Sequence, residues 1–447
     1  MAYKASEFNY IFKCDDGNLR MYNSMAGTGS LLIVGAEMRN DVLHVLEEGG
    51  SGDNLPEYVR EAFIKRGYLV PDERNEELAL DIRTAETIIG GKYLSLIIMP
   101  TEQCNFRCRY CYEDFRKGAM SQEMQDALIK YVAKNIANYV GMSVVWFGGE
   151  PLQALKVIEY LSNQFIEICR RAKKTYVAGI TTNGYGLTPE VYETLYRLKI
   201  LNYQVTLDGF RPQHDSQRVL ANGEGTFDRI VDNLMHIKSM RKIGVLFMIR
   251  TNFTRAILEN IDEYLRFYKE HFGDDQRFTF YIQKASDWGG ERVKDFSGEL
   301  AGDVHAFVLS KLKEYGIFLG RSSHFSELDC ELNTCYAAKK GHFVIGSDGT
   351  IYRCTTRFDF PENNVGKLKK GGYMELNENY EKWTRINEQR QDMCKSCFNR
   401  ASCLPMKCPY QNMKSDSIQC PPMGGDKLGM FLERFQEDLF YHLRAQN

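Results

Sequence analysis

The sequence predicts an α/β fold built around a parallel sheet. Between about residues 90 and 285, short apolar runs alternate with amphipathic stretches that are long enough for helices. Six such strand–helix units follow one another, and this alternation is typical of parallel sheets. At 447 residues the chain is long enough for two or three domains with a substantial core. The segments before and after the alternating region differ from it in pattern.

The expected strands are short apolar runs over residues 93–99, 143–147, 177–181, 203–207, 245–249 and 278–282. Amphipathic helices are expected between them. The first helix begins near Ser121, a favourable N-cap, and continues with apolar residues at helical spacing. Later helices are expected over residues 227–242 and 257–272. In barrels of parallel strands the chemistry takes place on loops after the carboxyl ends of the strands, so these loops are the first place to look for a site.

Residues 1–88 form a different kind of segment. Residues 9–14 and 19–22 look like short strands around an Asp-Asp-Gly-Asn turn, and residues 41–48 and 56–66 look like short helices. Strands followed by such a winged-helix-like part resemble the peptide-recognition domain of enzymes that modify ribosomally made peptides. A plain stabilising extension explains the same pattern equally well.

Three closely spaced cysteines, Cys104, Cys108 and Cys111, follow the first expected strand. Soft thiolates at such short intervals bind a soft metal centre, and iron–sulfur clusters are held by close cysteine runs of this kind. A zinc ion or an electron-transfer cluster would need a fourth ligand nearby, and no further cysteine appears for more than fifty residues. Three ligands on a four-iron cluster would leave one iron open to a group that is not protein.

The cysteine run resembles the signature of radical S-adenosylmethionine (SAM) enzymes. This resemblance implies a [4Fe-4S] cluster whose open iron is chelated by SAM. It also implies that an electron from the cluster cleaves SAM to a 5′-deoxyadenosyl radical, which abstracts hydrogen from an unactivated C–H bond. The fold it implies is a partial (β/α)6 TIM-like barrel, open at about three quarters of a turn. A chance cluster or part of a zinc site is the alternative, and the agreement of spacing with position disfavours it.

The resemblance places the SAM contacts in the loops after the second, third and fifth strands: Gly148, Gly149, Glu150, Thr182, Asn183 and Arg250. The Gly-Gly-Glu run is similar to the family motif whose backbone contacts the amino group of SAM. The Thr-Asn pair stands where the family contacts the ribose or the carboxylate, although Asn-Gly is also a common turn pair. The guanidinium of Arg250 matches the fork geometry of a carboxylate.

Eight of the remaining cysteines lie beyond residue 329, and their spacing closely resembles the SPASM domain, which binds two auxiliary iron–sulfur clusters. The resemblance assigns Cys330, Cys335, Cys354 and Cys408 to the first auxiliary cluster and Cys394, Cys397, Cys403 and Cys420 to the second. Three [4Fe-4S] clusters are therefore expected in all. One departure is visible, because four residues separate Cys403 from Cys408 where three are usual. A zinc knuckle of Cys394, Cys397, Cys403 and Cys408 is the alternative, and it leaves the other four cysteines unexplained.

Composition limits the partners of the chain. The net charge of −2 gives no case for binding nucleic acid or a membrane surface. No apolar run approaches membrane-spanning length, and the first ten residues lack the apolar core of a signal peptide. Cysteines that cluster like metal ligands, without a secretion signal, favour reduced thiolates. The sequence therefore predicts a cytoplasmic protein.

Together these resemblances predict a radical SAM oxidoreductase that matures a ribosomally made precursor peptide carrying a leader sequence. They favour an oxidative crosslink within the peptide, most of all a Cys thioether of the sactipeptide or ranthipeptide type, with a carbon–carbon crosslink next. A flavodoxin- or ferredoxin-like protein is the expected electron donor. Asp208, which closes the fourth strand, is a candidate catalytic base, and ordinary turn chemistry is its alternative.

Three domains are expected: a recognition domain over residues 1–88, the partial barrel over 89–300 and the auxiliary-cluster domain over 301–447. Two other functions stay open. Anaerobic sulfatase-maturating enzymes carry an aspartate directly after the cysteine that corresponds to Cys354, and Thr355 in that position counts against this activity. An iron–sulfur electron carrier would be a function without catalysis, but a carrier needs no open iron.

Overall fold

The computed structural model describes residues 2–50, 52, 55–88, 91–286, 289, 304–317, 335–384, 394–395, 397–403 and 408–414; within these ranges it leaves out the side chains of residues 28, 87–88, 305–306 and 403. By compactness the chain divides into two units. Unit 1 comprises Met1–Gly90, His324–Lys340 and Glu381–Asn447, and unit 2 comprises Gly91–Ser323 and Gly341–Tyr380. The division into three domains stays a prediction.

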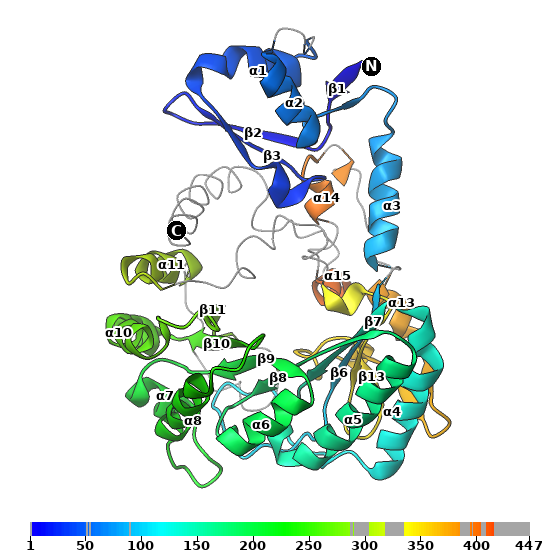
Figure 1. Cartoon of the computed structure of the whole chain (residues 1–447), viewed down its shortest axis with the longest axis vertical. Helices are drawn as coiled ribbons and strands as arrows, with labels where there is room; N and C mark the ends of the chain where they lie inside the picture. The colour runs from blue at the N-terminus through cyan, green and yellow to red at the C-terminus, as the bar shows by residue number, and fades with distance from the viewer. Residues whose placement is uncertain are drawn as a thin grey trace. The chain divides into compact units, whose positions relative to one another are not determined.

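A ten-stranded sheet forms the centre of unit 2 (Figure 1). Six of its strands are parallel and lie side by side in chain order: β6 (Tyr93–Ile98), β7 (Gly141–Trp146), β8 (Thr175–Thr182), β9 (Ile200–Thr206), β10 (Leu246–Phe253) and β11 (Phe278–Lys284). They coincide with the six predicted strands to within a few residues. The predicted α/β fold with a parallel sheet of the partial-barrel type is confirmed.

The helices of unit 2 connect and cover these strands: α4 (Gln122–Asn135), α5 (Leu155–Arg171), α6 (Pro189–Arg197), α7 (Arg211–Gln217), α8 (Phe227–Met240), α9 (Arg255–Glu259), α10 (Ile261–Phe272) and α11 (Val304–Glu314). Ser121 caps α4 as predicted, since its side chain accepts a hydrogen bond from the backbone of Met124. The prediction of a single helix over residues 257–272 is wrong. Asn260 divides it into α9 and α10, because its side-chain amide donates to the carbonyl of Ala256 and competes with helical backbone bonding.

An aromatic ladder fixes the register of the last three parallel strands. Tyr203, Phe247 and Phe278 stand directly opposite one another on β9, β10 and β11. Their ring centroids lie 4.6 and 4.9 Å apart, and the rings are nearly parallel at 16° and 11°. Cross-strand aromatic pairs contribute about 0.2–1 kcal/mol each. The ladder lies in the first half of the strands, away from their carboxyl ends.

A later segment of the chain extends the sheet beyond β6. Strand β12 (His342–Ile345) pairs in parallel with β6, and β13 (Thr350–Tyr352), β14 (Asn364–Lys369) and β15 (Tyr373–Leu376) continue it in antiparallel order. Ser95 and His342 also share a side-chain hydrogen bond of 3.1 Å. These strands were not among the predicted ones. They give β6 hydrogen-bonded neighbours on both sides.

Unit 1 contains two small sheets and several helices. The strands are β1 (Tyr3–Ala5), β2 (Asn9–Lys13), β3 (Leu19–Asn23), β4 (Leu32–Val34) and β5 (Leu69–Pro71), and the helices are α1 (Arg39–Leu46), α2 (Glu57–Lys65), α3 (Glu76–Ile88), α14 (Arg400–Cys403) and α15 (Pro409–Lys414). The predicted hairpin and the first two helices are confirmed. Among the described residues, six short 3-10 helices lie outside these elements: Gly27–Ser30, Ala36–Met38 and Tyr336–Ala338 in unit 1, and Ile136–Asn138, Pro151–Ala154 and Pro361–Asn363 in unit 2. Helix α13 (Asn379–Thr384) follows β15.

Part of the C-terminal cysteine segment packs on the N-terminal strands within unit 1. The ring of Phe398 stacks on Tyr10 with centroids 4.5 Å apart. Arg400 is 5% exposed, forms ion pairs with Glu7 and Glu77 at 2.6 and 2.5 Å, and lies 4.8 Å from the ring centroid of Phe8. Residues from both ends of the sequence therefore form one folded body. Among the described residues, no helix has the length and apolar character needed to cross a membrane.

Candidate active site

A cavity of about 160 Å³ in unit 2 is lined by the three clustered cysteines and by residues at the carboxyl ends of the parallel strands. All the expected SAM contacts except Glu150 line it: Gly148, Gly149, Thr182, Asn183 and Arg250. Residues that the sequence placed on four separate loops and strands thus share one cavity. Its other lining residues include Tyr110, Arg218 and Asn252, which the sequence analysis did not single out.

The chemistry of the three cysteines fits a metal cluster. Cys104, Cys108 and Cys111 all line the cavity. Burial raises the pKa of Cys104 to about 12 and holds the pKa of Cys111 well above its usual range. Such thiols stay protonated in water at neutral pH, so a thiophilic metal would have to replace the protons. Among the described residues, no group of three His, Cys, Asp or Glu side chains is placed to hold a single ion.

The loop that carries these cysteines (residues 104–111, here the cysteine loop) is held by backbone pairing with residues 217–221. Arg107 and Arg109 donate to the carbonyls of Val219 and Gln217 at 2.8 and 3.0 Å. Next to these two bonds, an antiparallel bridge joins Phe106 to Leu220. The cysteine loop contains no regular helix or strand, so these bonds to a distant segment fix its shape.

Two glycines after β7 let the chain close against residues 101–103, which lead into the cysteine loop. Gly148 has a φ of +107°, and a Cβ atom there would lie 2.5 Å from the carbonyl oxygen of Thr101. A Cβ atom at Gly149 would overlap the carbonyl oxygen of Gln103, which accepts a 2.9 Å hydrogen bond from the backbone of Glu150. Only glycine permits this approach without displacing the loop.

Gly149→Ala is therefore expected to push the cysteine loop outward and to destabilise unit 2 by about 1–3 kcal/mol, the usual cost of overpacking. We expect a lower melting temperature of the full chain and weaker SAM binding, measured by calorimetry. Gly186→Ala is the matched control, because a Cβ atom there meets only the Leu152 side chain, at 3.7 Å. Equal melting temperatures for the two variants would contradict this account of the glycine pair.

Glu150 supports the cavity from behind. It is 2% exposed, and its carboxylate accepts hydrogen bonds from the Thr182 hydroxyl at 2.7 Å, the Asn183 backbone at 2.7 Å and the Leu152 backbone at 3.0 Å. Burial raises the pKa of Glu150, and the three donors offset part of that effect. The Asn183 amide in turn donates to Asn105 in the cysteine loop at 2.9 Å. Glu150 thus positions two cavity residues.

Residues 98–280 match the family model described as the radical SAM superfamily, and this range contains the cysteine loop and nearly every residue placed at the cavity. The chain is a radical SAM enzyme. The family uses a [4Fe-4S] cluster with SAM, so the alternative of a carrier without catalysis is set aside.

Two known relatives of this radical SAM enzyme align with it over different lengths. A cysteine-type anaerobic sulfatase-maturating enzyme of Clostridium novyi is 25% identical over 372 residues, which are 74% of this chain and 93% of the relative. The radical SAM cyclopropyl synthase TigE of Paramaledivibacter caminithermalis is 25% identical over 268 residues, 52% of this chain and 54% of the relative.

Two solved structures share the fold of the radical SAM enzyme. One is native anSMEcpe with bound AdoMet and Kp18Cys peptide, with a TM-score of 0.57 and 20% identity, covering 78% of this chain and 99% of that one. The other is Streptococcus suis SuiB bound to precursor peptide SuiA, with a TM-score of 0.50 and 16% identity, covering 93% of this chain and 97% of that one. At 20% and 16% sequence identity, the similarity to these two structures is evidence for a shared fold alone.

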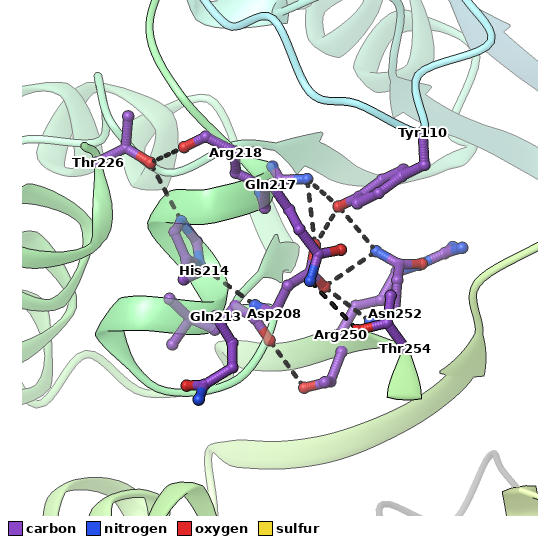
Figure 2. Close-up of polar contacts among 12 residues, drawn as sticks. Tyr110, Asp208, Gln213, His214, Gln217, Arg218, Thr226, Arg250, Asn252 and Thr254 are labelled. Carbon is purple, nitrogen blue, oxygen red and sulfur yellow. Dashed lines mark hydrogen bonds and ion pairs between the residues drawn. The ribbon is translucent and has the colours of Figure 1, made fainter. Parts of the chain in front are cut away.

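Behind the cavity of the radical SAM enzyme, Asp208 joins strands β9 and β10 to the cysteine loop (Figure 2). It is fully buried and accepts hydrogen bonds from the Asn252 backbone at 2.7 Å, from the Asn252 amide at 3.2 Å and from the Tyr110 hydroxyl. Arg250 donates to the Asn252 side chain at 3.0 Å. Asp208 is not among the cavity-lining residues. Its role as a base stays a prediction.

The C-terminal cysteines are described only in part. Cys354 follows β13 and is buried, and the side-chain amide of Asn363 both accepts from its backbone N–H and donates to its carbonyl, each at 2.8 Å. Cys335, Cys394, Cys397 and Cys408 lie within the described ranges. Cys403 lies in α14 with its side chain left out, and Cys330 and Cys420 lie outside the described residues. The two auxiliary ligand sets stay predictions.

Proposed function

We propose that this radical SAM enzyme matures a ribosomally made precursor peptide by forming an oxidative crosslink, with a Cys thioether as the leading product. The observation that carries the proposal is the fold shared over 93% of the chain with SuiB, whose structure holds the precursor peptide SuiA. The N-terminal strands and helices of unit 1 agree with the expected peptide-recognition domain. The cysteine-rich C-terminal third agrees with the expected auxiliary-cluster domain.

In this proposal the cavity binds SAM and the cluster. Cys104, Cys108 and Cys111 would hold the cluster, and Gly148, Gly149, Thr182, Asn183 and Arg250 would contact SAM. When bound, the cluster and SAM supply the 5′-deoxyadenosyl radical. Glu150 keeps Thr182 and Asn183 in place. The Asn252 side chain accepts a hydrogen bond from Arg250, whose guanidinium would bind the SAM carboxylate. The residues of the chain therefore bind and orient SAM.

The hydrogen atoms and electrons of a thioether crosslink can be accounted for step by step. The radical takes one hydrogen atom from a peptide carbon, and the thiol of a peptide cysteine loses its proton as the new C–S bond forms. One electron is left over, so each crosslink removes two hydrogen atoms from the peptide in total. The C-terminal cysteines would hold iron–sulfur clusters able to accept that electron. A flavodoxin- or ferredoxin-like protein would reduce the first cluster.

Sulfatase maturation is the second candidate. It is favoured by the sulfatase-maturating relative from Clostridium novyi, of which the alignment covers 93%. Thr355 counts against it, because it stands directly after Cys354, where those enzymes are expected to carry an aspartate, and a threonine hydroxyl is a much weaker base than a carboxylate.

The test uses the full chain, reconstituted anaerobically with iron and sulfide and reduced with dithionite in the presence of SAM. The substrates are a short Cys-rich peptide encoded beside the gene and a Cys-containing sulfatase peptide. Loss of two hydrogen atoms from the first peptide, together with a cysteine that no longer reacts with iodoacetamide, supports a thioether. The same loss with reactive cysteines indicates a carbon–carbon crosslink. Conversion of the sulfatase peptide alone overturns the proposal.

A further inference from the structure

Arg218 is a buried cation beside the cysteine loop. It is 7% exposed and lines the same cavity as Cys108. Its guanidinium carbon lies 5.6 Å from the ring centroid of Phe106 and 6.0 Å from that of Tyr110, the two aromatic residues that flank Cys108 in sequence. The positive charge therefore faces the middle of the loop.

Polar contacts hold Arg218 in this place (Figure 2). Its Nη1 donates to the Tyr110 hydroxyl at 2.6 Å and lies 3.8 Å from Oδ2 of Asp208. The Thr226 hydroxyl donates to its backbone carbonyl at 2.7 Å. Its side chain is thus tied to two groups, one on the cysteine loop and one at the end of β9.

One donor of Arg218 remains without a protein partner. The buried Nε bonds no protein atom among the described residues. A buried N–H group without an acceptor costs about 1–3 kcal/mol, so a partner is expected when the site is complete. The acceptors that a cluster would bring to this cavity are sulfur atoms, and hydrogen bonds to the sulfurs are one of the factors that set a cluster's potential.

The guanidinium keeps its charge in this setting. Burial lowers the pKa of Arg218, but Cys108, Tyr110 and Asp208 outweigh that effect and hold the pKa above its usual range. His214 adds no charge nearby. Its Nδ1 accepts the backbone N–H of Asp208 at 3.2 Å, and burial holds its pKa well below the usual value.

We propose that Arg218 raises the reduction potential of the cluster bound by the cysteine loop, and that the negative charge of Asp208 partly offsets this effect. The inference rests on the proposed ligation by Cys104, Cys108 and Cys111. Reduction adds one negative charge to the cluster. A fixed cation in a water-poor cavity stabilises that charge, and an N–H donor to a cluster sulfur acts in the same direction.

The experiment compares Arg218→Met, Arg218→Lys and Asp208→Asn with the wild-type full chain. Each reconstituted protein is titrated with dithionite while the electron paramagnetic resonance signal that changes on adding SAM is recorded. Iron content is measured in parallel. Arg218→Met is expected to shift the midpoint potential of this signal to a more negative value. Arg218→Lys, which keeps the charge, should stay closer to wild type.

Asp208→Asn gives the discriminating result. It removes the negative charge 3.8 Å from the guanidinium, so the potential is expected to shift the opposite way, to a less negative value. If the substitutions only loosened the site, the midpoint potentials of Arg218→Met and Asp208→Asn would shift in the same direction. Arg277→Met is the matched control, because Arg277 also pairs with an aspartate and lies 5.9 Å from a ring centroid, that of Phe278, but does not line the cavity.

Two results overturn the inference. One is an unchanged potential in Arg218→Met at full iron content, and the other is a negative shift in Asp208→Asn. If Arg218→Met binds no iron, the sign of the Asp208→Asn shift decides alone. These measurements need no peptide, so an error in the proposed peptide chemistry would appear in the mass spectra and leave the potentials as predicted.

Discussion

Cys108→Ala is expected to abolish reductive cleavage of SAM by this radical SAM enzyme. Cys108 is 8% exposed and lines the cavity together with the other two cysteines of the loop. Its loss would leave a cluster with two protein ligands. Removing a residue that merely supports a metal ligand costs about 10–100-fold, so loss of a ligand should exceed 100-fold. The effect is measured by chromatography, as the rate at which 5′-deoxyadenosine forms from SAM with dithionite as the reductant.

Cys169→Ala provides the control for Cys108. The thiol of Cys169 is also buried, but it lies in α5 and away from the cavity. This variant should form 5′-deoxyadenosine at the wild-type rate and bind the same amount of iron. Substantial 5′-deoxyadenosine from Cys108→Ala would show that the cluster is held by other residues.

Among the residues that line or support the cavity, Glu150 is expected to have the largest effect on stability when it is replaced by alanine. Its removal leaves the Thr182 hydroxyl and the backbone N–H groups of Asn183 and Leu152 without their acceptor. Each buried donor left without a partner costs about 1–3 kcal/mol, so we expect a loss of about 3 kcal/mol or more. Thermal unfolding of the reconstituted chain should show it, and SAM binding should weaken as well.

Glu150→Gln separates the hydrogen bonds from the space that the side chain fills. Glutamine can keep one oxygen toward Thr182 and Leu152, but its NH₂ group then meets the N–H of Asn183, so one bond is lost and the effect should be smaller. Glu190→Gln is a control, because Glu190 also accepts from a threonine hydroxyl but is exposed. Equal melting temperatures of Glu150→Ala and Glu190→Gln would refute the supporting role of Glu150.

Local patterns in the sequence were enough to predict the parallel sheet and one side of the site. Gly148 and Gly149 follow a strand directly, and a parallel sheet brings such loops to one edge. The pairing of residues 217–221 with the cysteine loop left no such pattern. It joins segments about one hundred residues apart through backbone hydrogen bonds. Such bonds do not depend on the identity of the side chains, so they leave no mark in the sequence.

Arg218 shows why buried charges are difficult to recognise in a sequence. It stands after a short helix in a polar stretch, where an arginine is ordinarily exposed. Its burial depends on Phe106 and Tyr110, which come from the cysteine loop, and on Asp208, which follows β9. Asn260 illustrates a similar limit, because the helical spacing of apolar residues continues past it and the competing side-chain bond is a matter of geometry.

The pairing of β12 with β6 has a consequence for biosynthesis. Strand β6 leads into the cysteine loop, yet its contact with His342 spans 247 residues of sequence. During translation, the backbone N–H and C=O groups on one edge of β6 stay unpaired until β12 has been synthesised. An unpaired strand edge can form hydrogen bonds with other chains. We therefore expect a chain truncated before residue 342 to aggregate even though it contains the whole cavity, and expression in cells to depend on chaperones that shield this edge.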